Sequence, residues 1–198
     1  MTAITREALD RRHVVDTVIK ARGDCLVVTG LGSSTYDAGL HDHPDIFYLW
    51  GAMGSAAMVG LGLALAQPAR RVLVVTGDGE MLMGLGAFAT IGAQAPTNLS
   101  IVVIDNEHYS ETGMQPTHTG RGVSLSGIAR ACSFADARTI RTDAELQAVV
   151  PTLFQAPGPR FLAVKVSTKR YPLSIRLRDG SHIKNRFREH LLGAAAFD

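Results

Sequence analysis

Two polar residues that follow apolar stretches could together bind a metal ion. Asp78 stands between two glycines in "TGDG", directly after "RVLVV", and Asn106 follows the apolar run of "LSIVVIDN". A buried carboxylate is costly unless it has a partner, and beside a phosphate that partner is expected to be a divalent cation. Mg²⁺ prefers oxygen ligands from a few side chains, phosphate and water. Asp78 and the amide oxygen of Asn106 therefore form a candidate Mg²⁺ site next to a bound phosphate.

Three glycine-bearing or polar segments lie where strands are expected to end. These are residues 30–34, 77–80 and 105–109. Ligands of open α/β sheets bind outside the carboxyl ends of the strands. Gly77 and Gly79 carry no side chain, so the backbone can approach a ligand closely. The helix expected from Glu80 presents free N–H groups that suit phosphate. One helix and one strand fit between Asp78 and Asn106, which brings both residues to one sheet edge.

Segments with strand and helix character alternate along the chain. Apolar runs predict strands over residues 25–32, 71–79, 99–106, 135–140 and 160–167. Helices are predicted over residues 4–23, 51–68, 80–95, 124–134 and 143–156, with a loop over 111–122. Uniformly apolar strands that alternate with helices are typical of a parallel sheet covered on both faces. We predict one α/β domain over residues 1–198: a three-layer, doubly wound parallel sheet of about six strands, followed by a basic tail after Ser167.

The composition argues against several classes of protein. The chain has 198 residues, 46% of them hydrophobic, which is enough for one globular core. A net charge of +2 gives no indication of nucleic acid binding, and no apolar run has membrane-spanning length. The N-terminus lacks the apolar core of a secretory signal, so we expect a cytoplasmic location. Cys25 and Cys132 form no CxxC pair, and we expect them to be reduced core residues.

In combination, these motifs resemble the diphosphate-binding half of thiamine diphosphate enzymes. That family carries GDG followed, after a stretch of this length, by an asparagine pair, which here is Asp105–Asn106. "GAMGSAAMVGLGLAL" resembles the pyrimidine-binding segment of the 2-oxo acid decarboxylases, and "DNEHYSETGMQPT" resembles the region after the metal site. The resemblance covers about residues 25–135. It is strongest to the sulfopyruvate and phosphonopyruvate decarboxylase group, in which short chains of this type occur as one subunit.

The resemblance implies specific roles for residues around the metal. Asp78, the side chain of Asn106 and the backbone carbonyl of His108 would ligate Mg²⁺. Backbone amides of Gly79 and Glu80 would hold diphosphate oxygens, with the Glu80 side chain structural or solvated.

Further roles follow for residues along the cofactor. Ser33 and Ser34 match positions that hydrogen-bond the diphosphate. The carbonyl of Gly51 would accept a hydrogen bond from the 4′-amino group of the pyrimidine. Met53 would hold the cofactor bent. The remaining residues expected to contact the cofactor are Gly77, Tyr109 and Thr112.

The family also needs a glutamate from a second domain, and we expect no such domain in this chain. In the family, a glutamate of a separate pyrimidine-binding domain promotes loss of the C2 proton. We therefore interpret the chain as the diphosphate-binding subunit of a two-chain 2-oxo acid decarboxylase that also self-associates. The alternatives are a subunit of an acetolactate-synthase-like carboligase and a cofactor-binding protein without turnover. A 2-oxo acid:ferredoxin oxidoreductase fits less well, because two cysteines cannot hold a four-cysteine cluster.

Several other residues are open to more than one interpretation. "GLGSST" begins like a dinucleotide-binding motif, but Thr35 replaces its last glycine, which argues against NAD. His41 and His43 fit either a metal pair or a surface loop, and His118 could contact the substrate.

The distal anion of a sulfonate or phosphonate substrate would require a cationic group, preferably arginine. Arg121 lies in the loop beside the expected site. The basic tail offers the other candidates: Lys169, Arg170, Arg176, Arg178, Lys184, Arg186 and Arg188.

Overall fold

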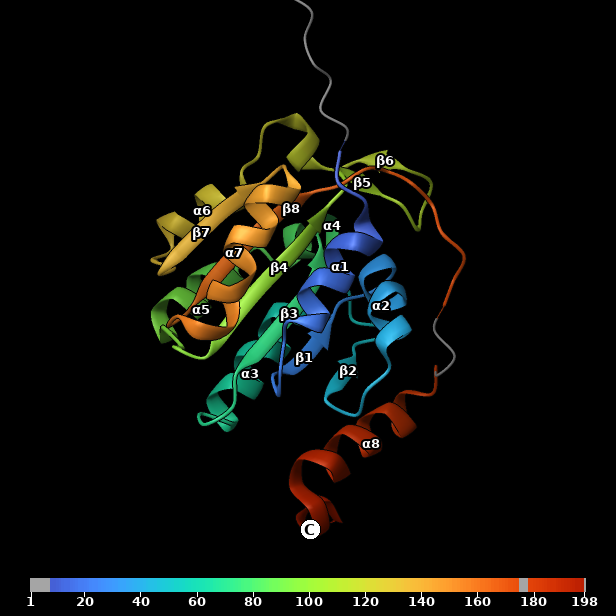
Figure 1. Cartoon of the computed structure of the whole chain (residues 1–198), viewed down its shortest axis with the longest axis vertical. Helices are drawn as coiled ribbons and strands as arrows, with labels where there is room; N and C mark the ends of the chain where they lie inside the picture. Colours follow the sequence, from blue (N-terminus) through green and yellow to red (C-terminus); the bar gives the residue numbers. More distant parts are fainter. Residues whose placement is uncertain (1–7, 175–177, 198) are drawn as a thin grey trace, which may run out of the picture.

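The protein is built around one parallel β-sheet. The computed structural model describes residues 8–174 and 178–197. Its six main strands are β1 (Leu26–Thr29), β2 (Ile46–Tyr48), β3 (Val72–Gly77), β4 (Leu99–Asp105), β7 (Asp136–Ile140) and β8 (Arg160–Lys165). They are ordered β2-β1-β3-β4-β8-β7, and every neighbouring pair is parallel (Figure 1). The predicted fold class is confirmed.

Helices cover both faces of the sheet. One face packs against α1 (Arg11–Lys20), α2 (Ser33–Ala38) and α7 (Asp143–Gln155), which lie together in Figure 1. The other face packs against α3 (Ala56–Ala66), α4 (Asp78–Met83), α5 (Ala87–Gln94) and α6 (Leu125–Ala131). Along β3, Val72 and Val74 join the second core while Leu73 and Val75 join the first. Both sides of each central strand are thus buried, which explains the uniformly apolar strand sequences.

One strand of the main sheet and two α-helices were not predicted. The short β2 lies at the sheet edge, and α2 begins at Ser33, directly after the first predicted strand. The basic tail also contains a helix, α8 (Gly180–Leu192), which packs against β2 and is followed by a 3₁₀ turn (Gly193–Phe197). Its Phe187 packs against Phe47 with the rings tilted and their centroids 5.5 Å apart. The N–H of Ser167 donates to the carbonyl of Leu9, so the tail leaves β8 beside the start of α1.

Some predicted boundaries were wrong. The helix predicted over 80–95 is two helices, and a methyl group at the intervening Gly84 would collide with the carbonyl oxygen of Gly54, 2.1 Å away. The helix predicted over 4–23 begins only at Arg11, because the Asp10 carboxylate caps it by accepting from the N–H groups of Arg12 and His13. The predicted start of that helix, residues 4–7, lies outside the described residues.

Two smaller features complete the fold. The loop predicted over 111–122 contains β6 (Gln115–Pro116), which pairs with β5 (His108–Tyr109), and a 3₁₀ turn (His118–Arg121); a second 3₁₀ turn (Gly39–His41) follows α2. Both cysteines are free, and burial raises the pKa of Cys25 to about 12. Within residues 8–174 and 178–197, no helix is long and apolar enough to cross a membrane.

Candidate active site

A cavity of about 340 Å³ lies at the carboxyl ends of β1, β3 and β4. Nearly all of the residues expected to contact the cofactor or the metal line it. These are Ser33, Ser34, Met53, Gly77, Asp78, Gly79, Glu80, Asn106, His108, Tyr109 and Thr112. The register of β3 and β4 pairs Gly77 with Ile104, which brings the residues after both strands to one edge. The structure therefore brings these residues together in one cavity, and their roles toward a cofactor or metal stay a prediction.

Asp78 is a buried carboxylate for which the described part of the chain supplies no cationic partner. Asp78 is only 2% exposed. Its Oδ2 accepts hydrogen bonds from the hydroxyls of Thr117 at 2.5 Å and Thr119 at 3.2 Å. Among the described residues, no lysine, arginine or histidine forms an ion pair with it. Burial, helped by the nearby carboxylate of Asp105, raises the pKa of Asp78 to about 6, although the hydrogen bonds from Thr117 and Thr119 act in the opposite direction. A bound cation would relieve this unfavourable charge.

Asp105 departs from the asparagine found at this position in the resembled family, and the structure shows what accompanies the change. Its Oδ2 lies 2.7 Å from Nζ of Lys165, at the end of the neighbouring strand β8, and its Oδ1 accepts from Thr119 at 2.8 Å. Lys165 also contacts Glu107 at 2.6 Å. The extra buried carboxylate is therefore paired, unlike Asp78.

Asn106 and His108 form a tight turn at the end of β4. The amide oxygen of Asn106 accepts from the N–H of His108 at 3.0 Å, and Nδ1 of His108 lies 2.9 Å from the carbonyl oxygen of Asn106. A side-chain oxygen that accepts one hydrogen bond keeps a second lone pair for a ligand. The turn thus holds Asn106 in the wall of the cavity that Asp78 also lines.

Gly79 has a role in packing that the sequence did not indicate. A methyl group at this position would lie 2.5 Å from Cε1 of Tyr109, whereas one at Gly77 would meet nothing within 4 Å. Gly79 therefore makes room for the Tyr109 ring. Only Gly77 leaves the open space that we had expected at both glycines.

Glu80 is structural, as one of our two interpretations of its side chain held. The residue is 4% exposed, and its Oε2 accepts from the N–H of Leu31 at 2.8 Å. Burial raises the pKa of this carboxyl. The contact fixes the loop after β1 to the first turn of α4, so two walls of the cavity are held together.

The segment before α3 lies at the cavity edge. Met53 lines the cavity and is 36% exposed, while Gly51 is exposed and is the one expected cofactor contact outside the cavity lining. Gly54, with φ of 96°, packs directly on Gly84 between α4 and α5. This contact positions Met53 beside α4.

Among the described residues, the cation candidates proposed from the sequence do not line the cavity. Arg121 and His118 are exposed in the 3₁₀ turn after β6. The described tail residues Lys169, Arg170, Arg178, Lys184, Arg186 and Arg188 are likewise absent from the cavity wall. Arg176 lies outside the described residues. The cationic residue that does line the cavity is Arg11, which the sequence did not single out.

His41 and His43 do not form a metal pair in the described part of the chain. His41 contacts Asp16 at 3.0 Å, whereas His43 contacts Asp45 at 3.3 Å. No cluster of three or more His, Cys, Asp or Glu side chains suited to a metal occurs among the described residues. The surface-loop interpretation fits these contacts better.

Comparison with known protein families agrees with this geometry. The family model described as "Thiamine pyrophosphate enzyme, C-terminal TPP binding domain" matches residues 32–164. The chain therefore belongs to this family of thiamine pyrophosphate enzymes.

Individual relatives agree with the narrower resemblance. Sulfopyruvate decarboxylase subunit beta of Methanothermobacter thermautotrophicus is 35% identical, over 94% of this chain and 97% of the relative. Phosphonopyruvate decarboxylase of Streptomyces viridochromogenes is 40% identical, over 72% of this chain but 36% of the relative. The predicted resemblance to this group is confirmed. The fold is similar to that of the solved structure of benzoylformate decarboxylase from Polynucleobacter necessarius, with a TM-score of 0.72. The two chains are 19% identical, and the match covers 87% of this chain and 36% of that one.

Proposed function

We propose that the chain is the diphosphate-binding subunit of a two-chain, thiamine diphosphate- and Mg²⁺-dependent decarboxylase of small anionic 2-oxo acids. One observation carries the proposal: the cavity gathers a buried, cation-free Asp78, Asn106 and the serines after β1. Similarity over the whole of a decarboxylase subunit beta adds support.

The residues present fit a metal-bridged diphosphate. In this assignment Asp78, the amide oxygen of Asn106 and the carbonyl of His108 hold Mg²⁺, which prefers such oxygen donors. The hydroxyls of Ser33 and Ser34 donate to the diphosphate. The raised pKa of Asp78 supports the assignment, since a cation would compensate a carboxylate that is otherwise stranded.

The work of this chain is then to bind and orient. When bound, thiamine diphosphate supplies a carbon nucleophile and an electron sink for decarboxylation. Met53 and Tyr109 pack beside the reactive half of the site and limit the access of water, and Glu80 keeps the loop after β1 in place. The proton transfer that activates the cofactor is assigned to a glutamate of the partner chain.

An apolar surface beside the cavity fits a partner subunit. Five large apolar side chains on or next to α3, α4 and α5 are exposed by a third or more: Met53, Met58, Leu65, Met83 and Leu85. Met53 and Met83 also line the cavity, so this surface borders the site. Exposed apolar patches commonly mark interfaces. We propose that the pyrimidine-binding subunit, and a second copy of this chain, cover it.

Reconstitution tests the proposal. The native complex would be purified, its second chain identified, and CO₂ and aldehyde release measured with sulfopyruvate, phosphonopyruvate, pyruvate and benzoylformate. We expect activity from the complex, a preference for the substrates with a distal anion, and none from this chain alone. Acetolactate as the product from pyruvate would favour the carboligase, and cofactor binding without turnover would favour a non-catalytic protein. Cell fractionation would test the proposed cytoplasmic location.

A further inference from the structure

Arg11 is a buried cation in the cavity wall that the proposed function leaves without a role. It is the first residue of α1, it is 7% exposed, and it lines the cavity together with Ser33 and Ser34. Arginine stays charged in proteins, so burying it is unfavourable unless its charge and N–H groups are paired.

Asp37 of α2 fixes the position of Arg11. The Nε of Arg11 lies 2.5 Å from Oδ2 of Asp37, and its Nη2 lies 3.4 Å from Oδ1. The same carboxylate, 1% exposed, also accepts from Nε of Arg12 at 3.0 Å. Two guanidinium groups thus share one carboxylate, and this group of three side chains keeps a positive charge.

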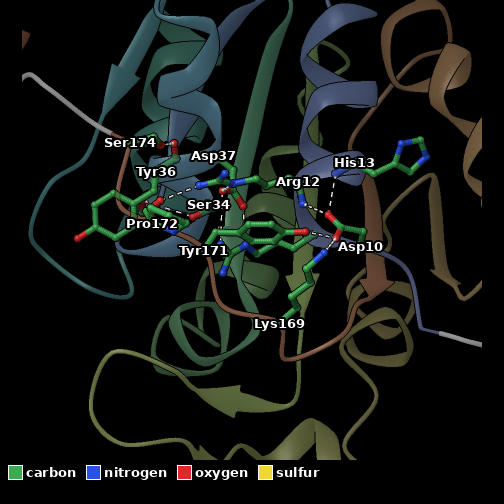
Figure 2. A network of polar contacts seen from close by, with 12 residues as sticks. Asp10, Arg12, His13, Ser34, Tyr36, Asp37, Lys169, Tyr171, Pro172 and Ser174 are labelled. Atoms are coloured by element: carbon green, nitrogen blue, oxygen red, sulfur yellow. Dashed lines mark hydrogen bonds and ion pairs between the residues drawn. The ribbon is translucent and has the colours of Figure 1, made fainter.

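Tyr171, in the C-terminal segment, covers this group. The guanidinium carbon of Arg12 lies 4.2 Å from the centre of its ring, and that of Arg11 lies 5.5 Å away. The Tyr171 hydroxyl donates to the Asp10 carboxylate (Figure 2). A further hydrogen bond joins Nη2 of Arg12 to the carbonyl oxygen of Pro172 at 2.7 Å. The segment after β8 is therefore held against the start of α1, beside the cavity.

The Arg11 guanidinium keeps donors for a ligand. It has five N–H groups, and within residues 8–174 and 178–197 its hydrogen-bonding partner is Asp37 alone. Ser34 and Asp37 are three residues apart in α2 and so lie on the same side of that helix. Arg11 and Ser34, the serine that is proposed to hold the diphosphate, also line the same cavity.

We propose that Arg11 binds a phosphoryl oxyanion of the cofactor diphosphate, and that Asp37 and Tyr171 are its positioning residues. The diphosphate carries more negative charge than a divalent cation held by Asp78 can neutralise, because the carboxylate cancels one of the two charges of that cation. Arginine suits phosphoryl oxygens because its planar group can donate to two of them at once. This inference rests on the proposed cofactor site.

The test is a calorimetric titration of the full chain with inorganic pyrophosphate in the presence of Mg²⁺. Arg11→Met is expected to weaken pyrophosphate binding about tenfold to a hundredfold, the usual effect of losing a charge-assisted hydrogen bond. Arg138→Met is the matched control, since Arg138 is an exposed arginine that pairs with Asp136 at 2.9 Å and does not line the cavity. Its affinity should stay within about threefold of the parent.

Arg11→Lys guards against a folding defect in Arg11→Met, because lysine keeps the charge beside Asp37 but cannot grip two oxygens. We expect a smaller loss than with methionine, and none in the matching Arg138→Lys. Equal affinities of the parent and both Arg11 variants, or failure of the parent to bind pyrophosphate, would overturn the proposal. A third result would also overturn it: Arg11→Met binds pyrophosphate as the parent does, but in the complex its KM is raised for sulfopyruvate and not for pyruvate. That result would assign Arg11 to the substrate.

The outcome is separable from that of the proposed function. Arg11-dependent pyrophosphate binding by a complex that decarboxylates no 2-oxo acid would retain this inference and reject the proposed activity. Decarboxylation by a complex whose pyrophosphate affinity does not depend on Arg11 would retain the proposed activity and reject this inference.

Discussion

Two walls of the cavity are built in different ways. The strand wall consists of Asp78 and Asn106 at the ends of the adjacent strands β3 and β4, whose register pairs Gly77 with Ile104. The arginine wall is Arg11 of α1, which contacts Asp37 of α2 and Tyr171 of the C-terminal segment, neither of which lines the cavity. One wall follows from a short motif at a strand end, whereas the other exists only after distant segments have packed together.

The walls also differ in charge. In the strand wall, Asp78 is buried without a cation, while Lys165 pairs with Asp105. Behind the arginine wall, the guanidinium groups of Arg11 and Arg12 share the single carboxylate of Asp37. The first wall therefore favours a cation and the second an anion. Together they suit a ligand in which a divalent metal and a diphosphate are joined, and variants of each wall should respond differently.

The largest effect is expected from Asp78→Asn. This change removes the charge that the Mg²⁺ needs while keeping the shape of the side chain, so cofactor affinity of the assembled complex should fall more than about a hundredfold. Calorimetry with thiamine diphosphate, with and without Mg²⁺, measures it. Asp16→Asn, on the exposed side of α1, is the charge control. Binding by Asp78→Asn at the parent affinity would remove Asp78 from the metal site.

Lys165→Met should have the next largest effect, on stability. It leaves the buried Asp105 without its cation, and breaking such a pair costs about 3–5 kcal/mol. Adding Asp105→Asn should recover most of this loss, because the neutral side chain needs no cation. Urea unfolding of the two single variants and the double variant gives the coupling. Additive losses would mean that the two side chains act independently.

The strand wall could be predicted because local sequence sets its geometry. An apolar run that ends in glycine, an acid and glycine indicates a strand end and a ligand loop, and a second strand end one helix later must lie beside it. The partners of Asp78 were missed, because Thr117 and Thr119 return to it from a loop whose path depends on tertiary packing.

The arginine wall could not be predicted from the sequence. "RRHVV" is a common start for an amphipathic helix, and nothing in it distinguishes the buried Arg11 from the more exposed Arg12. The distinction depends on α2 and on Tyr171, which reaches α1 because Ser167 pairs with Leu9. For the same reason α8 was missed: the contact between Phe187 and Phe47 that orders it joins opposite ends of the chain.

A smaller effect on stability reports whether Asp78, in the strand wall, is charged. Between about pH 4 and 6 the folded chain holds a proton at Asp78 that the unfolded chain has released, because burial raises the folded pKa. The free energy of unfolding therefore falls as pH rises through this interval, and the loss persists above it. Without metal, Asp78→Asn should be more stable than the parent by up to about 3 kcal/mol at pH 8, and the difference should shrink toward pH 4. Urea unfolding in chelator at both pH values measures it; a variant no more stable than the parent at pH 8 would contradict a stranded charge.

The smallest effect concerns the arginine wall. Tyr171→Leu removes the aromatic ring near both guanidinium groups, a contact worth about 0.5–1 kcal/mol at a partly exposed site. If the ring positions Arg11, pyrophosphate affinity should fall about twofold to fivefold. Tyr171→Phe is the matched control, because it keeps the ring and loses only the hydroxyl bonded to Asp10. We expect the phenylalanine variant to bind as the parent does. Equal losses in both variants would show instead that the hydroxyl, through Asp10 and the start of α1, holds this wall in place.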